Sequence, residues 1–177
     1  MSWSVDTSHS SVGFSVRHMM VSRVSGEFQD FEADIDLDPN NLEDSHVRAV
    51  IDTGSIDTGD DERDEHLRSD DFFKVEEHPS IEFESKEITS NGNGEFEVTG
   101  DLTIRDVTRT VTLTGTQQGP AEDPWGGRVV GYNLKGEIDR GDFGLTWNQA
   151  LETGGVLVGK EVSLEIDAEV TQQKEEG

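Results

Sequence analysis

The sequence predicts an all-β protein: an extended antiparallel β-barrel of about eight strands with one short helix. Apolar residues recur at every second position through most of the chain, which is the period of strands that bury one face. Clusters of Asp, Asn, Gly and Pro separate these runs, as turns require. Long strands with one apolar side must cover that side, and closing into a barrel does so.

Eight segments carry the alternation. In the clearest one, near the end of the chain, Val162, Leu164 and Ile166 alternate with acidic and polar residues. The predicted strands cover residues 12–18, 31–37, 47–51, 81–83, 96–104, 107–114, 130–138 and 162–170. Turn signals lie at residues 38–41, 90–94 and 119–127.

One segment, residues 60–71, breaks the pattern. It is highly charged, with Leu67 as its main apolar residue, and it predicts one short helix. Asp60 and Asp61 suit the positive N-terminus of such a helix. The chain shows no repeat or linker, so we expect a single domain over residues 1–171, followed by a solvated acidic tail at 172–177.

Several residues on the inward side of the predicted strands are small. A barrel of about eight strands is either filled by side chains or holds one small ligand. Small residues are compatible with an open lumen, and equally with local curvature of the sheet, so both interpretations stand. These residues are Ala33, Ala49, Gly100, Gly136 and Ala168.

The composition excludes several classes of protein. With 39 acidic and 14 basic residues the net charge is −25, which argues against nucleic-acid binding and disfavours an anionic bilayer. The absence of cysteine excludes disulfides, thiol catalysis and Cys-ligated zinc. Nine of the 14 basic residues are Arg and only five are Lys. Together with the acidic excess, this suggests a halophilic source, where molar salt screens self-repulsion.

The chain shows no targeting or membrane segment. Its first residues lack a basic region and an apolar core, so no secretory signal is expected, and no apolar run is long enough to span a bilayer. These observations predict a soluble, cytoplasmic protein without membrane insertion.

One enzyme-like motif stands out. Val50-Ile51-Asp52-Thr53-Gly54 resembles the way an aspartic protease presents a catalytic carboxylate, and a homodimer would supply the second carboxylate. Asp57-Thr58-Gly59 repeats the tripeptide at once, which favours a turn composition instead. No zinc, nucleotide-loop or nucleophile-elbow motif occurs, so we expect no metal, no required cofactor and no catalysis.

Two polar residues fall on predicted apolar faces. His18 shares a face with Phe14 and Val16, and Arg109 lies between Val107 and Val111. Either each ends a strand at the barrel rim, or each fixes the head of a ligand inside an apolar lumen.

A series of short motifs runs from Trp3 to about Val170. The motifs are Trp3-x-Val5-Asp6-x-x-His9-Ser10, Phe14-x-Val16-x-His18, Val24-x-Gly26-x-Phe28, Arg63-Asp64-x-His66-Leu67-x-Ser69-x-Asp71-Phe72-Phe73, His78-Pro79-x-Ile81-x-Phe83-x-Ser85, Gly100-x-Leu102-Thr103-Ile104, Val107-Thr108-Arg109-x-Val111 and Ile138-x-Arg140-x-x-Phe143-Gly144. In order and content this series resembles the YceI-like family. One position departs from the usual pattern of that family: Asp106 stands where Gly is common, which puts the geometry of that hairpin in question.

The resemblance implies a lipocalin-like barrel that carries or stores a polyisoprenoid, such as a prenyl quinone or prenyl phosphate, with its tail in the lumen. Asp6 and His9 would brace the N-terminal segment, while Phe72 and Phe73 would either plug one barrel end or simply pack. A homodimeric protease using Asp52 and a stress-response barrel acting through a protein partner are the alternatives. The expected apolar lining is Phe14, Val16, Phe83, Leu102, Phe143 and Trp147, and the expected head-group residues are His18, Arg63, His66 and Arg109.

Overall fold

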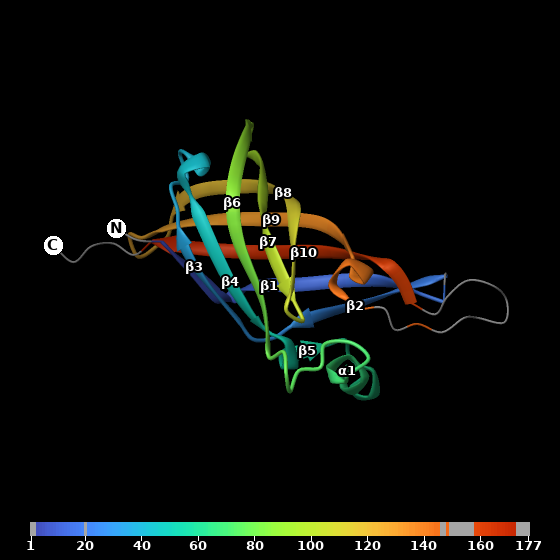
Figure 1. Cartoon of the computed structure of the whole chain (residues 1–177). Coiled ribbons are helices and arrows are strands. Elements are labelled where there is room, and N and C mark those ends of the chain that lie inside the picture. The colour runs from blue at the N-terminus through green and yellow to red at the C-terminus, as the bar shows by residue number, and fades with distance from the viewer. Residues whose placement is uncertain (1–2, 20, 146–147, 149–157, 173–177) are drawn as a thin grey trace.

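A computed structural model shows one antiparallel sheet that curls around an apolar interior, with a short helix at one end (Figure 1). The structure describes residues 3–19, 21–145, 148 and 158–172. Strands follow the order β3-β4-β6-β7-β8-β9-β10-β1-β2-β5. Their bounds are β1 Ser4–His18, β2 Ser22–Phe28, β3 Phe31–Asp36, β4 His46–Asp52, β5 Ile56–Asp57, β6 Ser80–Gly92, β7 Glu95–Ile104, β8 Val107–Glu122, β9 Arg128–Asp139 and β10 Val158–Gln172.

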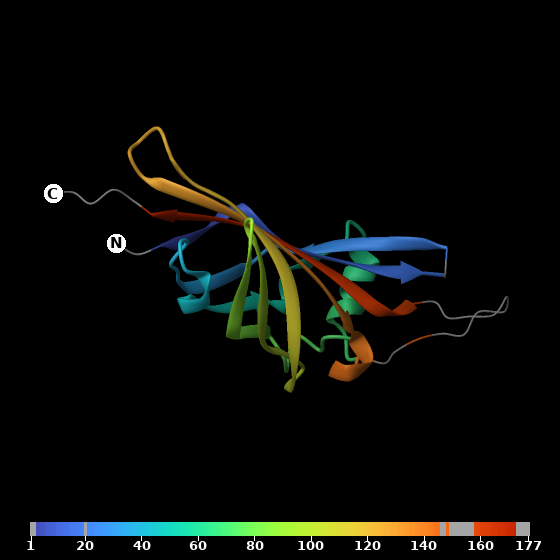
Figure 2. The ribbon, with the colours of Figure 1, turned by 90° about the horizontal axis from the view of Figure 1, so that it is seen from above.

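The predicted all-β, barrel-like fold is confirmed as one strongly curled antiparallel sheet. The two strands at the ends of the order, β3 and β5, are not hydrogen-bonded to each other in the described part of the chain. Residues 29–30 instead carry the chain directly from β2 to β3: Gln29 N–H donates to the Ser55 carbonyl beside β5 at 3.1 Å, and Asp52 N–H of β4 donates to the Asp30 carbonyl beside β3 at 2.9 Å. Figure 2 shows the curl from above, with both termini on the side away from the helix.

The sheet has ten strands where the alternation predicted about eight. β2 and the two-residue β5 were missed because neither has a long apolar alternation. β1 begins at Ser4 rather than near Val12, since its first half is polar. β8 continues to Glu122, so the turn predicted for 119–127 is shorter: Asp123 accepts the N–H groups of Trp125 and Gly127 at 2.9 and 2.8 Å.

The C-terminal boundary also shifts slightly. β10 runs through Gln172, which is buried, although that residue was assigned to the solvated tail. The remainder of the predicted tail, residues 173–177, lies outside the described residues.

The predicted short helix is confirmed as α1, Asp61–Arg68. Asp60 caps it, because its carboxylate accepts the N–H groups of Glu62 and Arg63. Acidic residues fill the first turn, while His66 and Arg68 occupy the last, in agreement with the helix dipole. The 3-10 helices η1 Leu42–Asp44, η2 Thr53–Ser55 and η3 Arg140–Phe143 complete the fold.

Asp106 keeps a tight hairpin between β7 and β8. Arg105 and Asp106 have φ values of 52° and 64°, as a two-residue type I′ turn requires. Ile104 and Val107 are paired directly across it. Asp tolerates the left-handed conformation better than most residues, so the register is retained without glycine at this position.

Candidate functional site

The concave face of the sheet encloses an apolar cavity of about 760 Å³. The inward residues of the alternating strands build its wall, and this is why the period-two pattern of the sequence matters for function. Four predicted lining residues belong to the wall: Phe14 and Val16 on β1, Phe83 on β6 and Leu102 on β7. Apolar side chains from β3, β4, β8, β9 and β10 complete it.

The small inward residues divide into two kinds. Ala33, Ala49 and Ala168 line the cavity, as an open lumen requires. Gly100 and Gly136 instead make room for neighbours. A Cβ atom on Gly100 would lie 2.4 Å from the Glu84 carbonyl oxygen, and one on Gly136 would lie 2.4 Å from Leu113 Cδ2. The alanines therefore fit the interpretation as an open lumen, the glycines admit close neighbours, and the interpretation as sites of local curvature stays a prediction.

Two further glycines lie beneath aromatic rings of the wall. Gly26 on β2 pairs with Phe14 on β1, and a Cβ atom there would be 2.6 Å from the Phe14 ring. Gly115 on β8 pairs with Phe96 on β7, with the equivalent distance 2.4 Å. Each glycine thus lets a ring lie across the neighbouring strand, which shapes the cavity wall.

Polar side chains gather where the end of β1 and α1 meet the cavity. His18, Arg63 and His66, three of the predicted head-group residues, all belong to the wall. Arg63 donates through Nε to Thr58 Oγ1 at 2.8 Å and through Nη2 to the Thr58 carbonyl at 2.9 Å. His66 Nε2 lies 2.9 Å from an Asp71 carboxylate oxygen.

His18 differs from these neighbours. Its imidazole is half-buried, yet it makes no hydrogen bond or ion pair with any residue that the structure describes. The side chain faces the cavity on the same side of β1 as Phe14 and Val16. Both ring nitrogens of His18 are therefore without a partner among the described residues.

Three predicted site residues lie elsewhere. Arg109 is exposed on β8, outside the cavity wall, and donates to the Thr108 carbonyl at 3.0 Å. Phe143 is 1% exposed and belongs to the core packed behind the wall. Trp147 lies outside the described residues.

Phe72 and Phe73 both contribute to the wall near α1. The Phe73 ring meets Phe28 edge-on at 6.0 Å between centroids, and the Phe72 ring meets His66 at 5.1 Å. This packing agrees with either role predicted for them, since rings that pack together can also close one end of a barrel.

Two arginines of the wall were not predicted as site residues. Arg140, 5% exposed, donates to the carbonyls of Leu145, Gly159 and Val158 at 2.6, 2.8 and 3.2 Å. Its burial lowers its pKa. The arginine therefore ties the segment after η3 to the start of β10. Arg140 stands in the motif Ile138-x-Arg140-x-x-Phe143-Gly144, but that motif gives no sign of its backbone acceptors. The other arginine is Arg17, which directly precedes His18 on β1 and also borders the cavity.

The two Asp-Thr-Gly tripeptides have the same local role. Gly54 N–H donates to Asp52 Oδ1 at 2.9 Å, and Gly59 N–H donates to Asp57 Oδ1 at 2.9 Å. Both aspartates are exposed and close a short turn at the start of η2 and before α1. A shared structural function thus accounts for the motif that resembled a protease.

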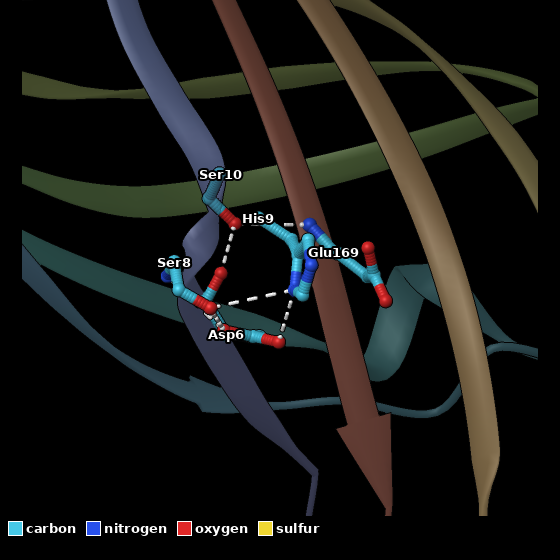
Figure 3. Close-up of polar contacts among 5 residues, drawn as sticks. All are labelled: Asp6, Ser8, His9, Ser10 and Glu169. Atoms are coloured by element: carbon cyan, nitrogen blue, oxygen red, sulfur yellow. Dashed lines mark hydrogen bonds and ion pairs between the residues drawn. The ribbon is translucent and has the colours of Figure 1, made fainter.

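Asp6 and His9 form a polar cluster with Ser8, Ser10 and Glu169 at a bulge of β1 (Figure 3). His9 Nδ1 donates to Asp6 Oδ2 at 2.7 Å, and Ser8 donates to Asp6 Oδ1 through both N–H and hydroxyl. These bonds, that from the Ser8 hydroxyl foremost, lower the pKa of Asp6 to about 2, while Asp6 raises the pKa of His9.

Ser10 fixes the same bulge to the neighbouring strand. Its hydroxyl donates to the Asp6 carbonyl at 2.7 Å and accepts the Glu169 N–H of β10 at 3.0 Å. The ligand atoms of Asp6, His9 and Glu169 lie within 4.8 Å of one another, close enough to share a cation. Hydrogen bonds already engage Asp6 and His9, so we interpret the cluster as the predicted brace of the N-terminal segment.

Comparison with known proteins gives the context of this site. The YceI-like domain model matches residues 3–170. A UPF0312 protein of Staphylococcus epidermidis is 42% identical over 165 residues, covering 93% of this chain and 94% of its own length. A UPF0312 protein of Staphylococcus aureus is 41% identical with the same coverage.

Solved structures share the fold. A Campylobacter jejuni YCEI protein superposes with a TM-score of 0.78 at 31% identity, covering 89% of this chain and 90% of that one. Burkholderia cenocepacia BcnA gives 0.80 at 25% identity, with 93% and 98% covered. A polyisoprenoid binding domain from Saccharophagus degradans gives 0.69 at 14%, with 98% and 99% covered, which is a likeness of fold alone. Among the described residues, no helix is long and apolar enough to cross a membrane.

Proposed function

The chain belongs to the YceI-like family, and from that membership and its cavity we propose that it binds a polyisoprenoid, with the tail in the cavity. One observation carries the proposal: an apolar cavity of about 760 Å³ runs along the concave face and has polar side chains at its α1 end. Such a site suits a long hydrocarbon with one polar head. We propose a role as carrier or store of this lipid.

Burial of the tail supplies the affinity. Each CH₂ group removed from water contributes about 0.8 kcal/mol, so a tail of several isoprene units binds well even after the cost of ordering it. The cavity offers this tail methyl, methylene and aromatic surface from strands on all sides. The alanines Ala33, Ala49 and Ala168 supply space where larger side chains would fill the lumen.

We propose that the head group of the lipid lies beside His18. Its imidazole has no partner among the described residues and can donate to, or accept from, a quinone oxygen or an alcohol. Arg63 and His66 lie on the same wall but are bound to Thr58 and Asp71. A net charge of −25 opposes a pyrophosphate, so we propose a neutral head, a prenyl quinone or alcohol, over a prenyl phosphate.

We propose that this binding involves no catalysis. The carboxylate of the protease-like motif, Asp52, is engaged in capping η2 and is exposed, away from the cavity wall. The YceI-like family is of the binding type. The cytoplasmic location and the halophilic source predicted from the sequence stay predictions.

Mass spectrometry of an organic extract tests the proposal directly, using protein purified from its native host in high KCl. We expect a prenyl lipid in stoichiometric amount, whose mass identifies the tail length and the head. An empty extract from a protein that also fails to take up added prenyl quinone contradicts the proposal and favours action through a protein partner.

A pair of matched variants assigns the binding to the cavity. Ala49→Trp places a large side chain into the lumen, whereas Glu97→Trp adds the same side chain to the exposed face of β7. We expect the first to lower uptake of a prenyl quinone at least about ten-fold and the second to leave it unchanged. Equal uptake by both variants, each shown to be folded, would place the ligand outside the cavity.

A further inference from the structure

The hairpin between β1 and β2 ends in an exposed apolar tip. We define the β1–β2 tip as Arg17, His18, Met19, Val21 and Arg23. Val21 is 87% exposed and Met19 47% exposed. Among the described residues, the other large apolar side chain with such exposure is Trp125, at 85%, on the turn between β8 and β9.

The charge of this tip is opposite to that of the protein. Residues 7–26 contain no Asp or Glu, although the chain has 39 of them in 177 residues. Arg17 and Arg23 are direct cross-strand partners, so two like charges face each other. Neither guanidinium forms an ion pair within the part of the chain that the structure describes, and Arg23 instead donates to Ser163 Oγ at 2.8 Å.

The neighbouring strand adds one charge of each sign. Lys160 and Glu161 of β10 are exposed close to Arg17, since Val162 pairs with Val16. Glu161 is not within ion-pair distance of Arg17 or Arg23 in the described structure. Three cations against one carboxylate leave this end of the hairpin net positive. Arg17 and Arg23 face each other without an ion pair to any described residue, and an external anion stabilises such an arrangement.

The tip adjoins the end of the ligand cavity. His18 and Val16 line the cavity, and Val158, the partner of His18 on β10, lines it too. Met19 follows His18 directly in the chain. Both views place the hairpin end and α1 on the side away from the termini (Figures 1 and 2). The exposed apolar residues therefore lie next to the polar end of the wall.

We propose that the β1–β2 tip docks the protein on an anionic lipid bilayer, with Met19 and Val21 entering the interface and Arg17 and Arg23 contacting lipid phosphates. The docking itself rests on the exposure and charge of the tip, and its role in exchanging the ligand rests on the proposed function. Apolar side chains flanked by cations are what an anionic bilayer surface binds.

The overall charge of −25 does not prevent this docking. At about 0.15 M salt the Debye length is ~8 Å, so a bilayer interacts mainly with the charges at the contact. Each basic side chain near an anionic surface raises binding about five-fold. Glu27, the first carboxylate after the tip, is four residues beyond Arg23 on an extended strand, about 13 Å away.

The absence of cysteine allows a single reporter to be placed at will. Val21→Cys and, as the matched control, Trp125→Cys are each labelled with an environment-sensitive fluorophore. The probe is a vesicle of phosphatidylcholine with about one third phosphatidylglycerol, compared with phosphatidylcholine alone, near 0.15 M KCl. We expect a blue shift at position 21 with the anionic vesicles, and none at position 125, where Glu122 and Asp123 are neighbours.

Charge reversal supplies the second arm. The double variant Arg23→Glu, Lys160→Glu, which changes no residue of the cavity wall, should lower vesicle binding at least about ten-fold and leave the uptake of prenyl quinone without vesicles unchanged. An unshifted label at position 21, or undiminished binding by the double variant, would overturn the docking surface. Loss of vesicle binding in inorganic phosphate but not in KCl of equal ionic strength would also overturn it, in favour of a phosphate site. Vesicle binding by a protein that takes up no quinone would support the docking and refute the proposed function.

Discussion

The two faces of the same strands differ in what determines their contribution to stability. On β10 the inward residues Val162, Leu164 and Ile166 line the cavity, whereas Glu165, between Leu164 and Ile166, is exposed. Burial and shape decide which substitutions the inward face tolerates. Substitutions there should therefore change the free energy of unfolding strongly, and this change should depend little on salt. Solvent screens the charges of the outward face. Substitutions there should therefore change the free energy of unfolding little, by an amount that depends on salt and pH. The inward face thus forms the ligand site, and the outward face makes the stability of the fold depend on salt and pH.

Two adjacent residues of β7 test this contrast most strongly. Phe96→Ala removes a ring that is 5% exposed, lies over Gly115 and meets Tyr132 at 5.7 Å. We expect it to lower the free energy of unfolding by about 3–5 kcal/mol. Glu97→Ala, on the exposed face, should change it by less than about 0.5 kcal/mol. Urea denaturation of both variants in one KCl buffer measures the difference, and equal losses would refute the distinction between the faces.

Two glycines allow the same comparison with the addition of a single methyl group, at a crowded position and at an open one. A Cβ atom on Gly115 would meet the Phe96 ring at 2.4 Å, whereas on Gly131 of β9 the nearest atom would be the Gln118 carbonyl oxygen at 4.0 Å. Gly115→Ala should therefore cost about 1–3 kcal/mol. Gly131→Ala should be neutral or stabilise by up to about 1 kcal/mol, since it restricts the unfolded chain.

Thermal unfolding of the two variants provides the measurement. Because both change Gly to Ala within a strand, their unfolded chains change alike, and the difference reports the native packing. A destabilised Gly131→Ala, or a Gly115→Ala variant as stable as the parent, would show that the rings can move and that the wall is not set by these contacts.

The faces themselves could be predicted from the sequence, because period-two alternation marks a buried side directly. The inward residues of 96–104 are buried, and those of 162–170 line the cavity, with Val170 buried and the others half-buried. The polar half of β1 and the short β5 could not be predicted, since their pairing is fixed by partners far along the chain. Val5 pairs with Val170, and Ile56 with Phe28.

The site was partly predictable for the same reason. His18 could be predicted as an inward residue because it alternates with Phe14 and Val16, and the structure places it on the cavity wall. Arg109 lies on the same side of β8 as Val111, but it is near the start of the strand and is exposed, because alternation does not show where the cavity wall ends. Arg140 was missed because its acceptors are backbone carbonyls of Leu145, Val158 and Gly159, which no side-chain pattern reveals.

A smaller effect is expected on the outward face. Glu161 of β10 and Asp139 of β9 are direct cross-strand partners with like charge. Glu161→Lys should raise the free energy of unfolding by about 0.5 kcal/mol at low salt. The gain should vanish in molar KCl, where the Debye length is about 3 Å. Unfolding titrations at both salt concentrations check this, and they show whether the parent itself is stabilised by KCl, as a halophilic protein requires.

The smallest effect concerns the exposed pair Asp6 and His9. Asp6, with its pKa lowered to about 2, contributes stability above its usual pKa near 3.8 and loses it as the pH falls toward 2. His9, with its pKa raised above 6.5, contributes below 6.5 and loses that contribution as the pH rises through the raised value. The pair therefore stabilises the fold between about pH 4 and somewhat above pH 6.5.

Removing the carboxylate tests this window. In Asp6→Asn the pKa of His9 should fall back toward 6.5, because its largest cause is the hydrogen bond to Asp6, and NMR titration of the imidazole measures it. Ser8→Ala is the control: it removes the hydroxyl donor to Asp6 but keeps the carboxylate, so the pKa of His9 should stay raised. An unmoved His9 in Asp6→Asn would transfer the role to Glu169, whose charge also raises this pKa. In every case the ligand cavity should be unaffected, because Asp6 and His9 lie outside its wall.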